Sequence, residues 1–578
     1  MPVQNAEIAS MFEEAADLLE IAGENPFRAR AYRRAARAID ALPQSIAGLI
    51  ANGEDLTAIS GVGKDLAGKI GGIVASGRFE LLDTLRDELP GDLAGMAALP
   101  GLGPKRIKLI HDKLGIRTLD DLRAVLDSGA LAALKGFGAV SAGRIADALA
   151  RPRQTARFRL AAAEAEAEAL TAHMRASGTR TGRARIARIA VAGSLRRRRE
   201  TVGDLDIVVT AKDGAAAGDQ LVSYDRVAEV LARGDTRTTV VLRSGLQVDL
   251  RAVGEDSYGA AVVYFTGSKP HNVALRGIAA GRGLKLNEYG LFSGNRRIAG
   301  ATEEEVYDAL GLAFVPPEMR EDRGEVALAQ AGKLPRLVTA DDMRGDLHVH
   351  SDWTDGSASI AAMAEAARGR GLAYIAVTDH SRRIAMAHGL DPAGVSRQIA
   401  EIDRVNQRLE GLTVLTGIEV DILRDGTLDL PDATLARLDV VVASIHSYFD
   451  LPRTAQTERL IRAVRNPHVD VIGHPTGRLI GARPPCDIDM ERVVAAAADT
   501  GCCLEINAQP DRLDLDDVAA RAARDAGVRL VVSTDSHTVD GFANMRFGVD
   551  QARRAWLTAG DVANTRPLRE LRKFLKRA

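Results

Sequence analysis

Residues 191–210 read VAGSLRRRRETVGDLDIVVT, and the end of this stretch has the pattern of a short buried β-strand. Side chains two positions apart point to the same face of a strand, so Asp204 and Asp206 present two carboxylates side by side. Carboxylates this close repel each other unless a cation lies between them. Because Mg²⁺ binds carboxylates together with substrate phosphate oxygens, the pair predicts metal-assisted phosphoryl transfer.

A bare pair of this kind is common, and the alternative is two solvated aspartates at a strand edge. Three neighbouring features favour the metal site. A small Gly193-Ser194 turn and an arginine run, residues 196–199, precede the pair, and the strand-like segment 247–251 supplies a third carboxylate, Asp249. Some arginines of the run are expected to be merely solvated.

These residues resemble the palm of the DNA polymerase X family, within the nucleotidyltransferase superfamily, and segments 264–268 (YFTGS) and 286–291 (LNEYGL) resemble its thumb. The resemblance implies Mg or Mn at the polymerase site. It implies that Asp204 and Asp206 bind both ions and that Asp249 helps deprotonate the primer hydroxyl. The implied contacts to the incoming nucleotide are Gly193, Ser194, Arg197, Tyr264, Phe265, Gly267, Asn272 and Arg276.

The aromatic pair Tyr264 and Phe265 is implied to lie against the incoming sugar and to discriminate against a 2′-hydroxyl. Two ordinary core aromatics are the alternative.

A glycine pattern, hydrophobic-x-Gly-hydrophobic-Gly before a helix, occurs three times near the N-terminus. The glycines permit a tight turn, and the free amides of the following helix can bind a DNA phosphate. The pattern resembles the helix-hairpin-helix motif, and such contacts position a duplex without reading its bases. The predicted DNA-binding glycines are Gly61, Gly63, Gly101, Gly103, Gly136 and Gly138.

The first helical unit also resembles the lyase domain of this polymerase family. Its Schiff-base lysine falls on Lys69, and an amine nucleophile needs a lowered pKa. The family's supporting lysine four residues earlier is Asp65 here, so a plain surface lysine is the alternative.

A second chemistry begins at Gly345. Histidines and acidic residues repeatedly follow short apolar strands that helical stretches separate, which is the layout of an α/β barrel with its site at the strand ends. Imidazole-rich sites with carboxylates suit Mn, Zn or Fe, and two or three clustered ions activate water for phosphate displacement.

This half resembles the polymerase and histidinol phosphatase (PHP) domain. All nine metal-binding positions of that family have the expected residue type, and they are His348, His350, Asp355, His380, Glu419, His446, His474, Asp535 and His537. Arg478 and Arg512 are candidates for contacts to substrate phosphate, with solvated arginines as the alternative.

The net charge of −2 at 578 residues excludes a uniformly basic protein, so any nucleic-acid surface is local. Three cysteines without a CxxC pair suit a reducing compartment. No signal-peptide pattern is present, and we expect a cytoplasmic, bacterial, nucleoid-associated location and a monomer.

The expected fold is multidomain, α and α+β, ending in a distorted (β/α)7 PHP barrel. The expected domains are a lyase-like helix-hairpin-helix domain (1–90), fingers with two such motifs (91–150), palm (151–253), thumb (254–317), a linker (318–340) and the PHP domain (341–578).

The predicted function is short-gap-filling DNA synthesis in repair, on gapped or nicked DNA with deoxynucleoside triphosphates, combined with a PHP 3′-5′ exonuclease. AP endonuclease and 3′-phosphatase activities are further options. In one alternative, the protein is mainly a DNA-end nuclease or phosphatase, and the polymerase core is a scaffold that binds DNA. Another is a binding module with both sites dormant.

Overall fold

The structure is a computed structural model that describes residues 5–40, 42, 46–59, 61–89, 93–96, 102–138, 141–143, 145–146, 157–177, 186–383 and 388–575. Two compact units divide the chain, residues 1–156 and residues 157–578. Within the described ranges, no helix is both long and apolar enough to cross a membrane.

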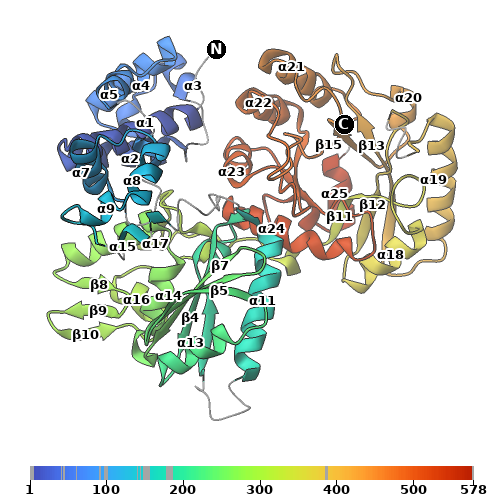
Figure 1. The fold of residues 1–578 in the computed structure, drawn as a ribbon. Coiled ribbons are helices and arrows are strands. Elements are labelled where there is room, and N and C mark those ends of the chain that lie inside the picture. The colour runs from blue at the N-terminus through green and yellow to red at the C-terminus, as the bar shows by residue number, and fades with distance from the viewer. Residues whose placement is uncertain are drawn as a thin grey trace. The chain divides into compact units, whose positions relative to one another are not determined.

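The first unit is entirely helical where it is described (Figure 1). Ile8, Phe12 and Leu19 recur at helical spacing on one face and are fully or almost fully buried in the core of the first half. A second core, around Ile107 and Ile110, belongs to the later helices. The helices are α1 (Asn5–Ala22), α2 (Pro26–Asp40), α3 (Ile46–Ala51), η1 (Leu56–Ala58), α4 (Lys64–Ser76), α5 (Glu80–Glu88), α6 (Leu93–Met96), α7 (Pro104–Leu114), α8 (Leu119–Asp127) and α9 (Ala130–Ala133).

The second unit begins with a five-stranded sheet in the order β2-β4-β7-β6-β5. β4 and β7 run parallel in its centre, and Asp206 is the Cα partner of Asp249. Leu205, Ile207 and Val209 are fully buried on the face opposite Asp204 and Asp206, which places β4 as the sequence pattern predicts. The elements are β1 (Phe158–Arg159), α11 (Leu160–Ser177), β2 (Arg188–Val191), α12 (Gly193–Arg196), β3 (Thr201–Val202), β4 (Asp204–Thr210), α13 (Gly214–Val222), β5 (Val227–Arg233), β6 (Arg237–Leu242) and β7 (Gln247–Val253).

Next comes a small α+β region with an antiparallel sheet in the order β10-β9-β8. Residues 318–340, where the sequence suggests a linker, contain one complete short helix and parts of two others. Glu325 in this segment is fully buried and contacts His271 at 2.6 Å. The elements are η2 (Glu255–Ser257), α14 (Tyr258–Thr266), α15 (Lys269–Gly281), β8 (Lys285–Asn287), β9 (Gly290–Ser293), β10 (Arg296–Ala299), α16 (Glu303–Ala309), η3 (Pro317–Met319), α17 (Glu325–Gln330) and η4 (Ala340–Asp342).

The C-terminal region contains seven parallel strands in sequential order, β11 to β17 (Figure 1). The first and last strands adjoin, because the His350 amide donates to the Ser536 carbonyl at 2.9 Å. The expected seven-stranded α/β barrel is therefore confirmed. Its strands are β11 (Gly345–Val349), β12 (Tyr374–Val377), β13 (Thr413–Asp421), β14 (Val440–Ser444), β15 (Val471–Ile472), β16 (Cys503–Asn507) and β17 (Leu530–Ser533).

Helices alternate with these strands, and the apolar face of each helix is buried against the barrel. They are α18 (Ile360–Gly369), α19 (Pro392–Asn406), α20 (Asp432–Leu435), α21 (Arg453–Val464), α22 (Met490–Thr500), α23 (Asp517–Asp525), η6 (Gly541–Asn544), α24 (Met545–Arg554), η7 (Ala563–Thr565) and α25 (Leu568–Leu575).

Candidate active sites

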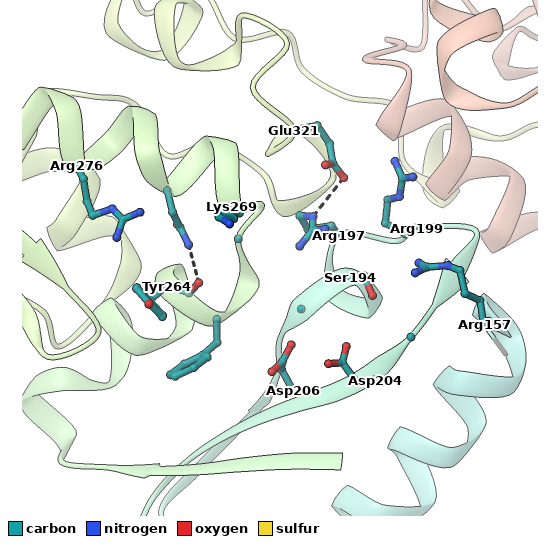
Figure 2. Close-up of a pocket in the computed structure, with 15 residues that line it drawn as sticks. Arg157, Ser194, Arg197, Arg199, Asp204, Asp206, Tyr264, Lys269, Arg276 and Glu321 are labelled. Carbon is teal, nitrogen blue, oxygen red and sulfur yellow. Dashed lines mark hydrogen bonds and ion pairs between the residues drawn. The ribbon is translucent and has the colours of Figure 1, made fainter. Parts of the chain in front are cut away.

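Asp204 and Asp206 lie side by side at the start of β4 and face Ser194 across a pocket (Figure 2). Burial and the neighbouring carboxylates Asp204 and Asp249 raise the pKa of Asp206 to about 7. The pKa of Asp204 is also raised, by desolvation and by Asp249. Carboxylates that destabilise one another's charge in this way form a donor set that fits a divalent cation.

Gly193 approaches the carboxylate of Asp206 so closely that a Cβ at this position would collide with it. Its φ of 64° is also in the region that favours glycine. The close approach to Asp206 and the positive φ together explain why glycine occupies position 193 in this turn.

Asp249 lies on β7 beside Asp206, and its carboxylate is held by three neighbours that sequence analysis did not identify. Oδ1 accepts from Thr239 Oγ1 at 2.7 Å and from Arg237 Nη2 at 2.9 Å. Oδ2 accepts from Gln247 Nε2 at 2.8 Å. Burial opposes ionisation, but these donors lower the pKa of Asp249, so the group is a carboxylate at neutral pH.

The pocket above the aspartates has a volume of 760 Å³. All eight residues predicted to contact the nucleotide line it, although they come from α12, α14, α15 and the loops beside them. Tyr264 is 36% exposed, so it is not a core aromatic. The further lining residues are Arg157, Arg199, Gly203, Asp204, Asp206, Lys269 and Glu321.

Three of the four arginines in the run have specific side-chain partners. Arg196 pairs with Glu303 at 2.5 Å, and Arg197 donates to Glu321 at 3.2 Å. Arg198 donates to Asp550 of the barrel at 2.7 Å. These partners lie more than a hundred positions away in the chain, so no local pattern could indicate them.

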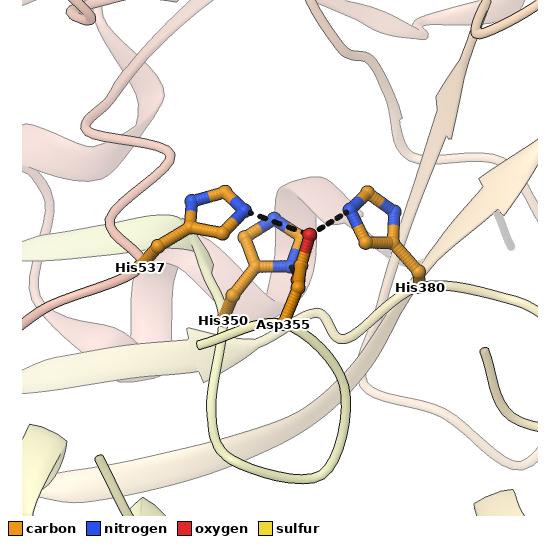
Figure 3. Close-up of side chains that lie close together, drawn as sticks. All are labelled: His350, Asp355, His380 and His537. Carbon is orange, nitrogen blue, oxygen red and sulfur yellow. Dashed lines mark ion pairs between the residues drawn. The ribbon is translucent and has the colours of Figure 1, made fainter. Parts of the chain in front are cut away.

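The barrel brings the nine predicted ligands together at the carboxyl ends of its strands. Three overlapping groups have ligand atoms within 4.8 Å of one another. Figure 3 shows the group nearest the surface, with His350, Asp355, His380 and His537. The other groups are His348, His350 and Asp535, and His380, Glu419 and His446, while His474 Nε2 lies 2.9 Å from Glu419.

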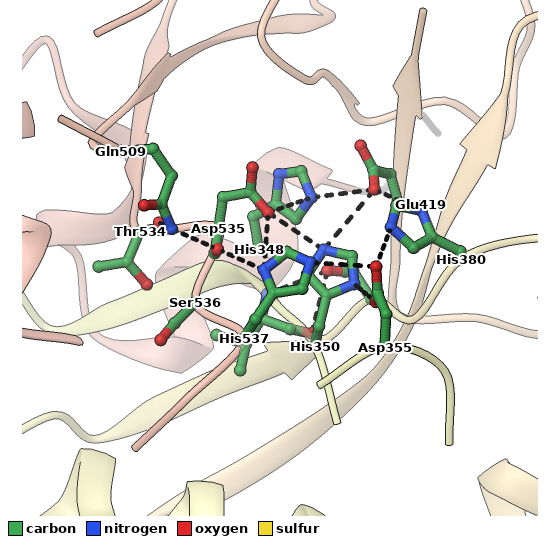
Figure 4. A network of polar contacts seen from close by, with 12 residues as sticks. His348, His350, Asp355, His380, Glu419, Gln509, Thr534, Asp535, Ser536 and His537 are labelled. Atoms are coloured by element: carbon green, nitrogen blue, oxygen red, sulfur yellow. Dashed lines mark hydrogen bonds and ion pairs between the residues drawn. The ribbon is translucent and has the colours of Figure 1, made fainter. Parts of the chain in front are cut away.

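The ring nitrogens of this cluster fit metal ions. Buried ring nitrogens that lack a well-formed hydrogen bond converge there beside carboxylates: His348 Nε2 lies 3.4 Å from Glu419, and His350 Nε2 lies 3.2 Å from Asp535 (Figure 4). A buried polar atom without a partner costs free energy unless something coordinates it. Burial, with His537 and His380 nearby, lowers the pKa of His350 to about 3 and leaves it in the neutral form that binds metal.

The pKa of His380 is shifted in the opposite direction, upward. Burial opposes its protonation, yet the carboxylates of Glu419 and Asp355 raise its pKa to about 10. This concentration of negative charge beside imidazoles is the electrostatic environment that a cation cluster stabilises.

Two carboxylates that the sequence analysis did not identify orient predicted histidine ligands by contacting the Nδ1 atoms of their rings. Glu505 Oε1 lies 2.8 Å from His348 Nδ1, and Asp421 Oδ1 lies 3.0 Å from His446 Nδ1. Each contact turns the other ring nitrogen toward the cluster. A carboxylate inside an otherwise apolar strand, as in β16 (CLEIN), is the signal that could have revealed Glu505.

Arg478 donates to Glu200 at 2.6 Å and to the backbone carbonyl of Arg512 at 2.9 Å. Its candidate role in binding substrate phosphate stays a prediction. Arg512 Nε lies 3.8 Å from the predicted ligand Asp535.

The second glycines of the three repeats are exposed, and Cβ atoms there would meet open space. Gly63 and Gly103 are the N-caps of α4 and α7, and the Ala142 amide donates to the Gly138 carbonyl. Gly61 and Gly136 have positive φ, whereas Gly101 lies outside the described residues.

Lys69 is 2.6 Å from Asp65. Desolvation favours the neutral amine, but the contacts with Asp65 and Tyr32 outweigh it and raise the pKa of Lys69. This direction is opposite to what a Schiff-base nucleophile needs.

The geometry defines a nucleotidyltransferase core joined to a metal-dependent phosphoesterase barrel, and comparisons with known proteins agree. Matching family models are a helix-hairpin-helix domain (residues 3–79), a SAM-like helix-hairpin-helix tandem (94–151), the DNA polymerase beta thumb (261–321) and the PHP domain (346–509).

One relative matches along its whole length. The DNA polymerase/3′-5′ exonuclease PolX of Bacillus subtilis (strain 168) is 37% identical over 576 residues, which cover 99% of each chain. A probable phosphatase of Thermoanaerobacter sp. (strain X514) is 31% identical over 242 residues, 40% of this chain and 94% of the phosphatase. The chain belongs to the bacterial PolX family of DNA polymerases/3′-5′ exonucleases.

Proposed function

We propose that the chain fills short gaps in DNA during repair and trims 3′ ends in its barrel. The observation that best supports gap filling is the palm pocket, where Asp204, Asp206 and the eight predicted nucleotide contacts line one cavity. Arg157, Arg197 and Arg199 in its walls suit a triphosphate, because guanidinium groups bind phosphate oxygens through paired hydrogen bonds.

Asp204 and Asp206 would hold Mg²⁺ or Mn²⁺, with Asp249 as the third carboxylate. Such ions supply charge stabilisation at the attacking and leaving oxygens. Ser194 and Arg197 bind the triphosphate, and Tyr264 and Phe265 lie along the sugar. Asp249 accepts the proton of the primer 3′-hydroxyl.

In the barrel, the nine ligands would hold two or three Mn, Zn or Fe ions, which supply an activated water for phosphoester hydrolysis. Asp355 and His537 are the ligands nearest solvent, at 36% and 35% side-chain exposure, so a DNA end approaches from their side. The same site would accept an abasic-site phosphodiester or a 3′-phosphate.

In the first unit, the exposed glycine turns would hold the duplex through its phosphates, as at other helix N-termini. Because such contacts ignore sequence, they suit a repair enzyme that acts at any gap.

The test uses a gapped duplex with a labelled primer, Mn²⁺, and three proteins, wild type, Asp204→Ala and His348→Ala. We expect Asp204→Ala to lose only extension and His348→Ala to lose only 3′ degradation. Normal extension by Asp204→Ala would refute the palm assignment, and wild-type degradation by His348→Ala would refute the barrel assignment. Duplexes carrying an abasic site or a 3′-phosphate, tested with the same variants, decide the two further activities.

A further inference from the structure

A barrel arginine reaches the wall of the palm pocket. Arg554, the last residue of α24, is 2% exposed and bonds to three acceptors. It donates to the backbone carbonyl of Arg197 at 2.7 Å and to Glu321 Oε1 at 3.1 Å. Its other terminal nitrogen donates to Asp517 Oδ2 at 2.7 Å.

The same oxygen of Glu321 also accepts from Arg197 Nε at 3.2 Å. One carboxylate oxygen therefore lies between two guanidinium groups, one from the palm and one from the barrel. Arg197 is further held by the Thr266 carbonyl, which accepts from Nη1 at 2.5 Å.

Glu321 lines the pocket that we assign to the triphosphate. Burial opposes its ionisation, but Arg554 and Arg197 lower its pKa, so it is negatively charged at neutral pH. An uncompensated carboxylate in this wall would repel the triphosphate and compete for Arg197, because charges interact strongly away from bulk water.

Arg554 is itself firmly placed. Asp517 at the start of α23 binds it from the far side and also accepts from Arg323 at 2.8 Å. A buried guanidinium whose donors have several acceptors cannot turn away without leaving charges unpaired.

We propose that Arg554 is a positioning residue of the polymerase site, through which the barrel orients Arg197 and offsets the charge of Glu321. The barrel then has a second task that is independent of its own metal cluster. The inference rests on the proposed role of the palm pocket in nucleotide binding.

The test measures kcat and KM for the incoming nucleotide on a single-nucleotide gap with the full-length protein at saturating Mg²⁺. For Arg554→Met we expect KM to rise about tenfold while kcat stays within about threefold. The exonuclease rate of the same preparation should stay within about twofold of wild type, which also shows that the barrel is folded.

Arg553→Met is the matched control. Arg553 precedes Arg554 on α24 and donates to Glu318 at 2.8 Å and to the Val338 carbonyl at 3.0 Å, and neither of these partners lines the pocket. Its KM should equal that of wild type.

A double-mutant cycle separates charge compensation from general damage. In a Glu321→Gln background there is no charge to offset, so the KM penalty of Arg554→Met should fall below about threefold. A wild-type KM for Arg554→Met, or an equal penalty in both backgrounds, overturns the proposal.

If Arg554→Met does not fold, Arg554→Lys replaces it, because a lysine keeps the charge but cannot serve all three acceptors. A KM rise of about threefold then supports the proposal, and a wild-type KM overturns it. Failure of the wild type to extend the primer would instead refute the proposed function.

Discussion

Asp206 and Asp249 are Cα partners on the adjacent parallel strands β4 and β7. The third carboxylate of the palm is therefore beside the first two because of strand register. A slip by one residue would turn Asp249 to the opposite face of the sheet.

Asp249→Asn should abolish most of the extension activity. The amide cannot accept the primer proton, and a positioned general base contributes about 10²–10⁴-fold to a rate. Single-turnover extension at pH 7.5 measures the loss, and exonuclease activity should be retained. A loss of less than tenfold would show that another group takes the proton.

The Mg²⁺ requirement for extension should depend on pH. Burial, with Asp204 and Asp249, raises the pKa of Asp206 to about 7, so below pH 7 the cation must displace a proton. We expect the apparent Mg²⁺ affinity to rise about tenfold per pH unit up to about pH 7 and then level off. Extension titrated with Mg²⁺ from pH 5.5 to 8.5 measures this, and an affinity independent of pH would contradict it.

Glu505→Gln should weaken the barrel site alone. Glu505 orients His348 from 2.8 Å, and loss of such a supporting carboxylate typically costs about 10–100-fold in metal affinity or activity. Exonuclease rate and bound-metal content should fall together while extension is unchanged. Glu458→Gln, in an exposed pair with Arg492, is the control and should behave like wild type.

Asp65→Ala should increase borohydride trapping of an abasic-site duplex on Lys69. Removing the partner 2.6 Å away lowers the pKa of the amine, so more of it is unprotonated at pH 7.5. The side chain of Asp65 is 78% exposed, so solvent screens the pair and we expect an increase of only about two- to fivefold. Lys64→Ala should leave trapping unchanged, and trapping that persists in Lys69→Ala would assign the adduct to another amine.

Gly103→Asp should weaken DNA binding without weakening the fold. Gly103 is an exposed N-cap with open space around it, and aspartate is a favourable N-cap, so stability should be equal or about 0.5 kcal/mol higher. Its charge repels a phosphate at the helix N-terminus, so affinity for gapped DNA at 0.1 M salt should fall about tenfold. Thr118→Asp, at the N-cap of α8, is the matched control. Equal losses in both variants would argue against specific binding at the glycine turn.

Much of the architecture follows from local pattern. Apolar strands that end in histidines or acids, with helices between them, predicted the barrel, because parallel strands of one barrel place their carboxyl ends together. The resemblance to the PHP domain implied the set of nine ligands, and the barrel places these residues close together. The alternation of Asp204 and Asp206 with Leu205 likewise determined which face of β4 carries the carboxylates.

Local sequence pattern thus predicted which carboxylates and imidazoles gather at each site, since periodicity indicates which side chains share a face or a strand end. The residues that surround these groups depend on how distant elements pack together. Glu505 behind His348, Arg237 on Asp249, and the chain Arg197, Glu321, Arg554 join residues from distant elements. Local periodicity cannot predict such pairs, because their geometry arises from the packing of whole elements. A single charged residue in the sequence does not indicate which distant residue it will contact.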